Sequence, residues 1–323
     1  MGYASGAKKL WEIIDDIAAG LIASAGGYWT DGDVTWTTTD KTGNNARRCL
    51  HYVNGAEELY VALEQINQTS GINYYYTGSQ WYYGKGLRIV LSATWDGVGH
   101  TYPASNQSTL IPFENYQAGG VSTDMATLLV TYYLWIESNG FVLMGKPEPT
   151  ATPQQQSFFT VLERNSSKEY SDGYTNFYCL SVLNVYGGGQ GSTMYDGQDG
   201  VTSINRSRLI LRPFSYQYPD TATRLGAVTP TGNGISFVPT PTYYAFKSSG
   251  DGKAYYVKPI VHNLSGQVTP IFQAELWFPW SESVGLIDGD VVAVEGFTTK
   301  FLCKALDSPD STARLLFAIK YVA

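Results

Sequence analysis

The sequence predicts a mainly β protein with one helix at its N-terminus and strands arranged as antiparallel sandwich or barrel-like domains. Short aromatic and apolar runs recur with turn residues between them about every eight to twelve positions, a pattern typical of such folds. Tyrosine occurs 25 times, and charged residues make up only 15% of the 323 residues. Aromatic strands, glycine turns and few charges also suit a protein whose surface is partly covered by partners.

The helix is predicted over Ser5 to Ala25 and ends at Gly26-Gly27. Its apolar face repeats at helical spacing and consists of Leu10, Trp11, Ile13, Ile14, Ile17, Ala18, Leu21 and Ile22. A face this wide must be buried, and we expect it to dock on the sheet of its own chain. The alternative is a neighbouring subunit, for which the candidate assembly contacts are Leu10, Trp11, Ile14, Ile17 and Leu21.

Residues 28–150 are predicted as a first β domain that follows the helical segment 1–27. The domain opens with a hairpin in which Tyr28–Thr30 and Val34–Thr37 flank the turn Asp31-Gly32-Asp33. The aromatic stretch 72–83 is interpreted as a loop that Gly78 interrupts. Further strands, two pairs of which are joined by Asn-Gly turns, are predicted over 48–53, 58–63, 87–95, 128–136 and 140–144.

Residues 151–323 are predicted as a second β domain. The segment 146–156 is rich in Pro, Thr and Gln, which indicates a linker or a loop that crosses the end of a sheet. The glycine-rich stretch 187–200 is predicted to be an exposed loop, within exposed central loops over about 187–250. The strands of this half are predicted over 157–163, 178–183, 204–211, 255–261, 273–278, 291–295, 299–305 and 315–321.

Charge and cysteine content exclude several classes of protein. The formal net charge is −7 and no basic track is visible, so nucleic acid is not expected as a partner. The three cysteines, Cys49, Cys179 and Cys303, are far apart in apolar runs and are expected to be reduced core residues. A secretory signal or a membrane span is rejected because acids interrupt the N-terminal apolar segment.

The candidate metal and phosphate sites are weak. His51, His100 and His262 lie apart, without the spacing of a zinc site. Two acidic turns, Asp196–Gly200 and Asp288-Gly289-Asp290, are the best calcium candidates, although Asp-Gly is ordinary hairpin chemistry and a turn is the preferred interpretation. The run 187–191 lacks the Lys and the following helix of a phosphate loop. No metal, cofactor or catalytic residue is therefore assigned.

An aromatic surface is the remaining candidate for binding. Trp81, Tyr82, Tyr83 and Trp95 are candidates for contact with a glycan or a protein partner. A glycoside hydrolase would need two carboxylates beside such aromatics, and Asp96 and Glu114 are the candidate acids that could lie near them. The same aromatic side chains also make a good strand face, so an enzyme is the least favoured of these alternatives.

The order of the segments resembles a family of tailed-bacteriophage virion proteins. Members begin with a short helix, step into a strand through a GxxWT motif, and then carry an acidic pair that runs into a strand. The middle of the family has an aromatic strand, a turn and a hydrophobic strand, and its end has a Gly-Asp turn followed by two strands. The corresponding segments are Leu10–Ala23, Gly27–Thr30, Glu57–Leu63, Leu134–Leu143, Gly289-Asp290, Phe301–Ala305 and Phe317–Lys320.

The resemblance implies a non-enzymatic structural component of the virion, associated with the tail or baseplate. It implies a protein that is made in the host cytoplasm, assembles in multiple copies, and contacts other virion proteins without a cofactor. Residues 187–250 depart from the family pattern. The alternative function is a receptor- or carbohydrate-binding module at the virion periphery, which would use the aromatic stretch 72–95.

Overall fold

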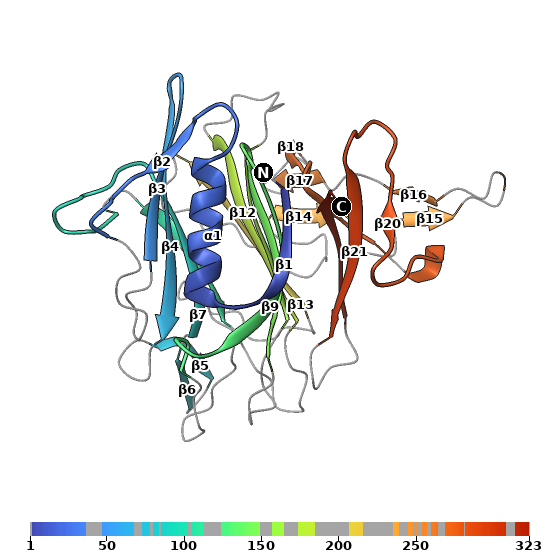
Figure 1. Ribbon diagram of the computed structural model, residues 1–323, viewed down its shortest axis with the longest axis horizontal. Helices are drawn as coiled ribbons and strands as arrows, with labels where there is room; N and C mark the ends of the chain where they lie inside the picture. The colour runs from blue at the N-terminus through green and yellow to red at the C-terminus, as the bar shows by residue number, and fades with distance from the viewer. Residues whose placement is uncertain are drawn as a thin grey trace.

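The computed structural model describes residues 2–36, 47–67, 73–77, 80–83, 85–102, 105–112, 124–148, 157–164, 174–184, 207–215, 235–238, 245–247, 250, 254–256, 260–263, 269–280, 282–307 and 314–322. Within these ranges the protein is mainly β with one α-helix, as the sequence predicts, and the sheets are antiparallel. Three of the sheets stack as layers, with a central sheet and one outer sheet on each of its faces (Figure 1). The helix lies between the central sheet and one of the two outer sheets.

The central sheet forms the middle layer and is apolar on both faces. Its strands, in spatial order, are β1 (Gly2–Lys9), β9 (Leu129–Glu137), β10 (Gly140–Pro147), β11 (Phe158–Arg164), β12 (Tyr174–Asn184) and β13 (Ser207–Ser215). Strand β10 is buried along nearly its whole length, because it has a packed layer on each side. A strand covered on both faces needs a continuous apolar run rather than alternation, and Phe141–Met144 supplies one.

The first outer sheet covers one face of the central sheet. Its spatial order is β2 (Trp29–Asp31), β3 (Arg47–Asn54), β4 (Glu57–Asn67), β7 (Lys85–Ser92) and β8 (Ser105–Pro112). Apolar side chains alternate along these strands, so that Leu59, Val61 and Leu63 face the central sheet while Tyr60 and Ala62 face outward. The turn predicted at Asn54-Gly55 joins β3 to β4, and Gly55 supplies the positive φ that it needs.

The second outer sheet covers the opposite face of the central sheet. Its order is β19 (Trp277–Pro279), β22 (Arg314–Tyr321), β21 (Lys300–Asp307) and β20 (Val291–Val292), and a 3-10 turn at Glu282–Val284 precedes β20. Trp277, Phe317 and Ile319 pack on Phe159 and Val161 of the central sheet. The smaller sheets are β14 (Ile235–Val238) with β17 (Ile260–Asn263) and β18 (Thr269–Gln273), β15 (Ala245–Lys247) with β16 (Ala254–Tyr256), and β5 (Asn73–Thr77) with β6 (Gln80–Tyr83).

The helix α1 (Leu10–Ile22) fills the space between the first outer sheet and the central sheet (Figure 1). It begins at Leu10 because the backbone N–H of Lys9 donates to the Glu12 carboxylate at 2.9 Å, which caps the first turn. Leu10, Ile14, Ile17 and Leu21 are fully buried in the core that α1 shares with both sheets. The apolar face of the helix is therefore buried in the core of its own chain, as expected, rather than on a neighbouring subunit.

Polar side chains tie the layers together at their rims. Arg48 on β3 pairs with Asp15 of the helix at 3.2 Å and with Asp31 of β2 at 2.5 Å. Arg164 on β11 pairs with Glu57 on β4 at 2.7 Å, which joins the first outer sheet to the central sheet. The indole N–H of Trp29 donates to the carbonyl of Ser138, and this bond links the same two layers. Lys320 pairs in the same way with Glu137 at 2.9 Å across the other interface.

The start of the chain differs from the prediction. Residues 5–9 were predicted to be helical, but Gly2–Lys9 forms β1, which pairs along its full length with β9. The reason is tertiary, because without β1 the backbone groups at this edge of β9 would have no strand partner. Only Leu10–Ile22, the part of the predicted helix with a continuous apolar face, is helical, and residues 23–25 form a turn instead.

Two other local predictions are wrong. Residues 34–36, the described part of the second predicted strand of the hairpin, form a turn, because the Asp33 carboxylate binds the N–H groups of Thr35 and Trp36, and β2 pairs with β3 instead. The aromatic stretch predicted as a loop instead contains the hairpin β5–β6.

The predicted domain boundary at residue 150 falls inside the central sheet, since β10 and β11 on either side of it are hydrogen-bonded neighbours. The predicted loop at 187–200 lies outside the described residues.

Candidate functional site

The helix residues that were candidates for assembly are used inside the chain. Leu10, Ile14, Ile17 and Leu21 have no exposed surface, and only Trp11 is half-buried at the edge of the helix. The Lys9 ammonium lies 5.9 Å from the centre of the Trp11 indole. These four aliphatic side chains are therefore not available to a neighbouring subunit in this fold, because the core of the chain already covers them.

The structure separates the aromatic residues that were grouped as a contact site. Trp81, Tyr82 and Tyr83 lie on β6, in the hairpin that extends past the end of β4 and β7 (Figure 1). Trp95 lies beyond the other end of β7. The eight residues of β7 span about 26 Å at ~3.3 Å per residue. One ligand of ordinary size cannot contact both groups, so Trp95 belongs to a different site.

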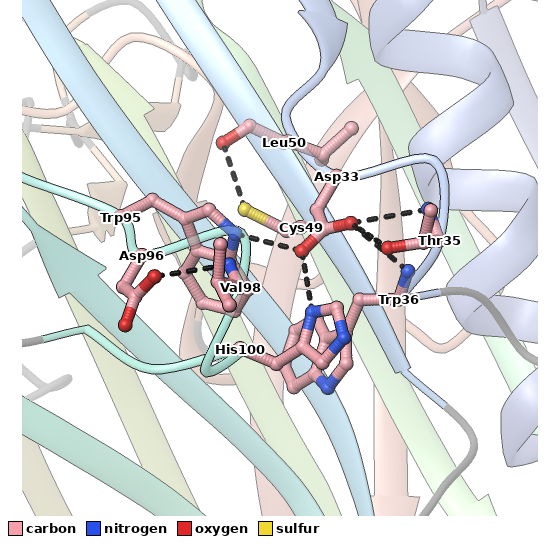
Figure 2. Close-up of polar contacts among 9 residues, drawn as sticks. All are labelled: Asp33, Thr35, Trp36, Cys49, Leu50, Trp95, Asp96, Val98 and His100. Atoms are coloured by element: carbon pink, nitrogen blue, oxygen red, sulfur yellow. Dashed lines mark hydrogen bonds and ion pairs between the residues drawn. The ribbon is translucent and has the colours of Figure 1, made fainter.

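That different site is a polar cluster around Asp33 on the outward face of the first outer sheet (Figure 2). Two loops meet there: residues 32–36 follow β2, and residues 93–102 follow β7. Outward side chains of the sheet and side chains of the two loops together form a small apolar cluster, made of Trp36, Cys49, Ala62 and Val90 with Tyr60, Trp95 and Tyr102 at its edge. We call the polar cluster the Asp33 network.

The Asp33 carboxylate accepts hydrogen bonds from both loops. One oxygen accepts from the backbone N–H and the hydroxyl of Thr35, at 3.1 and 2.7 Å, and from the backbone N–H of Trp36 at 3.1 Å. The other accepts from Trp95 Nε1 at 2.9 Å and pairs with His100 Nδ1 at 2.8 Å. The Asp33 side chain is only 5% exposed, so these bonds replace the water it has lost.

Burial and hydrogen bonding act in opposite directions on Asp33. Burial alone raises its pKa, because a carboxylate is less stable away from water. The bonds from Thr35, His100 and Trp95 favour the charged form more strongly, and together they lower the pKa to about 2. Asp33 is therefore ionised at any physiological pH, and its charge holds the two loops together.

The Asp33 network resembles part of a catalytic arrangement in one respect. A carboxylate that binds Nδ1 of a histidine orients the imidazole, as it does in catalytic triads and around metal ligands. The nearest thiol, Cys49, is fully buried, and its pKa is raised by burial first and then by the charges of Asp33 and Asp31. A thiol that resists ionisation is a poor nucleophile. The geometry thus favours fixing the loops over reacting with a substrate.

The remaining acidic and histidine candidates also make internal contacts. Asp96 accepts the backbone N–H of Val98 at 2.9 Å, whereas Glu114 lies outside the described residues. His51 pairs with Glu58 at 2.7 Å and stacks on Tyr60, while nothing is described of the His262 side chain. Among the residues that the structure describes, no three His, Cys, Asp or Glu side chains gather as a metal site requires.

The second acidic turn is a structural turn at the edge of the second outer sheet. Asp288 pairs with Lys304 at 2.8 Å and accepts the backbone N–H of Ala305 at 2.7 Å. Asp290 accepts the backbone N–H of Ile287 at 2.9 Å, and Gly289 has the positive φ of 91° that the turn needs. The Asp288 carboxylate thus holds the segment 287–290 against β21, and the Asp290 carboxylate closes the turn within the segment. The other calcium candidate, at 196–200, lies outside the described residues.

Cys49, Cys179 and Cys303 are buried thiols of the core, as predicted. Sequence reasoning missed the Asp33 network, because Asp33 and His100 are 67 positions apart and neither carries a motif. The one available signal was the pair of Trp-containing turns, with Asp33 before Trp36 and His100 after Trp95. No helix in the described ranges is long and apolar enough to cross a membrane.

Comparisons with known proteins add no family to this picture. No protein-family model and no curated protein matches the chain.

Proposed function

We propose that this protein is a non-enzymatic structural component of a bacteriophage virion, associated with the tail or baseplate, that acts through contacts between subunits. The ordered resemblance of its sequence segments to tailed-phage virion proteins motivates the proposal. Apart from the turn Gly289-Asp290, those segments fall on α1 and on strands of the three layers, namely β2, β4, β9, β10, β21 and β22. In this proposal the chain is made in the host cytoplasm and assembles with copies of itself and with other virion proteins.

The observation that supports this proposal best is that carboxylates fix surface turns on both outer sheets. In each case buried or paired carboxylates fix a turn, Asp33 on one side and Asp288 with Asp290 on the other. Each of these turns carries an aliphatic side chain that is largely exposed, namely Val98 and Ile287. Fixed turns that present apolar side chains suit protein contacts, because little conformational freedom is lost on binding.

Purified particles provide the direct test. Phage particles banded on a density gradient should contain this chain in a fixed ratio to the other virion proteins, as measured by quantitative mass spectrometry. Electron microscopy with an antibody fragment against the chain should label the tail or its baseplate end. If the chain is missing from banded particles and remains in the lysate supernatant, the proposed virion role is wrong.

The alternative of a receptor- or carbohydrate-binding module has one specific observation in its favour. The hairpin β5–β6 extends beyond the first outer sheet, and residues 73–83 contain aromatic residues but no charge. Glycan-array binding should be lost in Trp81→Ala if this hairpin binds sugars. Trp95→Ala is the matched control, because Trp95 lies at the opposite end of β7. Equal loss in both variants, or no binding by the wild type, would count against this alternative.

A further inference from the structure

Two Asn-Gly pairs of this protein lie at the ends of hairpins, and their backbones are held differently. Asn54-Gly55 lies where β3 ends, and Asn139-Gly140 lies where β10 begins. A third pair, Asn233-Gly234, lies outside the described residues. Because glycine has no side chain to shield its backbone nitrogen, that nitrogen can approach the carboxamide of a preceding asparagine closely enough to react with it. The fold decides which of the two pairs can do so.

The backbone nitrogen of Gly140 is held inside the central sheet. The N–H of Arg164 donates to the Asn139 carbonyl at 2.7 Å, so Gly140 and its partner Glu163 on β11 are a pair without hydrogen bonds between them. The N–H and C=O of Gly140 therefore point the other way, toward its partner Glu137 on β9. Gly140 is also buried. Its nitrogen cannot reach the Asn139 carboxamide unless the end of the strand opens.

The backbone nitrogen of Gly55 lies in a turn rather than in a ladder. Asn54 and Glu57 are the last cross-strand pair of the β3–β4 hairpin, so Gly55 and Ala56 are the two residues of its turn. Both turn residues are exposed, and Gly55 has a φ of 64°. The Asn54 carboxamide donates a hydrogen bond from Nδ2 to the Tyr52 hydroxyl at 3.2 Å. Loss of this bond and a local change in the turn bring the two reacting groups together without opening a sheet.

We propose that Asn54 is a site of spontaneous deamidation in the folded protein and that the fold protects Asn139. The Gly55 nitrogen forms a bond to the side-chain carbonyl carbon of Asn54, and the bond from that carbon to the amide nitrogen breaks. Water carries the proton of Gly55 to the departing nitrogen, which leaves as ammonia. A second water then opens the cyclic imide at either of its carbonyls and gives aspartate or isoaspartate. The net reaction consumes one water and releases one ammonia.

Either product changes the end of the hairpin. A carboxylate at position 54 lies near those of Glu57 and Glu58, and it adds negative charge beside the ion pair of Glu57 with Arg164. That ion pair joins the first outer sheet to the central sheet. Isoaspartate also adds a carbon to the backbone, which disturbs the register of the pair Asn54–Glu57. Deamidation thus loosens a link between two layers as the protein ages. The inference goes beyond the proposed function and does not depend on it.

Peptide mapping of folded and unfolded protein tests the site. The purified protein is incubated at mildly alkaline pH, in buffer or in urea, and conversion at each asparagine is followed by mass spectrometry of its peptides. In buffer, Asn54 should be converted about tenfold faster than Asn139, because Gly140 must first leave its ladder position. In urea the two sites should react at similar rates, since glycine follows both asparagines.

Asn54→Gln is the matched variant, because its longer side chain disfavours closure of the cyclic imide. It should abolish conversion at position 54 while leaving the rate at Asn139 and the circular dichroism spectrum unchanged. An Asn54 that stays intact in buffer but reacts in urea would overturn the inference. Equal conversion of Asn54 and Asn139 in the folded protein would also overturn it. Absence of the chain from banded phage particles would refute the virion role alone.

Discussion

The two faces of the first outer sheet are built on different principles. The inward face packs on α1 and the central sheet through fully buried aliphatic side chains such as Ile17, Val61 and Leu63. The outward face buries a small apolar cluster, and the Asp33 carboxylate accepts hydrogen bonds from the two loops that cover this cluster. The inward face is a large apolar interface, whereas the outward face depends on hydrogen bonds to one charge.

This difference indicates that the two faces of the sheet have separate structural roles. Apolar burial scales with area and tolerates small changes in direction, so the inward face supplies most of the stability of the fold. Hydrogen bonds to a carboxylate are directional, so the outward face fixes the positions of its loops. A change in the inward face should therefore unfold the protein, while a change in the outward face should release the loops and leave the layers intact.

The largest effect is expected for Ile17→Ala on the helix. Ile17 has no exposed surface and packs in the core that α1 shares with two sheets. Its truncation should lower the free energy of unfolding by about 2–5 kcal/mol, measured by urea denaturation. Ala19→Ser on the exposed side of the helix is the control and should cost about 0.5 kcal/mol or less. Similar costs for both variants would contradict the assigned helix orientation.

Asp33→Asn should have a smaller and local effect. The amide keeps one acceptor oxygen but loses the charge that satisfies Thr35, Trp95 and His100, a loss of about 2 kcal/mol. Cys49, beneath the loops, should become reactive toward a thiol reagent before Cys179 and Cys303 do, as followed by mass spectrometry of the labelled peptides. Simultaneous labelling of all three thiols would mean global unfolding and would contradict the local role.

The acid sensitivity of stability should also depend on Asp33. Its pKa in the folded protein is about 2, below the ordinary value of 3.8, so its contribution is full above about pH 5 and is lost as the pH falls toward 2. Over this interval the wild type should lose about 2 kcal/mol more stability than Asp33→Asn, as measured by urea denaturation at each pH. Parallel curves for the two proteins would show that Asp33 is not the group responsible.

The smallest effect is expected for Trp95→Phe. This change removes the indole N–H that donates to Asp33 at 2.9 Å but keeps an aromatic ring against Trp36, whose centre is 4.8 Å away. The free energy of unfolding should fall by about 1 kcal/mol. Hydrogen exchange should rise in residues 95–101 and remain unchanged in α1, and a rise in α1 would contradict the independence of the two faces.

Much of the fold was predictable because its signals are local. The apolar positions of α1 repeat at helical spacing, the run Phe141–Met144 is continuous, and glycine occupies the turn at Asn54-Gly55. Each is a property of a few neighbouring residues. The prediction of a hairpin after Asp33 failed although the cause is also local, since the Asp33 side chain binds the N–H groups of Thr35 and Trp36 and turns the chain.

The sequence by itself determined the β class, the buried face of the helix and the burial of the three cysteines, because hydrophobic pattern and turn chemistry act over short distances. Only the tertiary structure decided that Gly2–Lys9 is a strand of the central sheet, that Trp95 is separated from Trp81, and that Asp33 meets His100. Those outcomes depend on which strands become neighbours when the layers close, and the layers bring together residues that no local pattern connects.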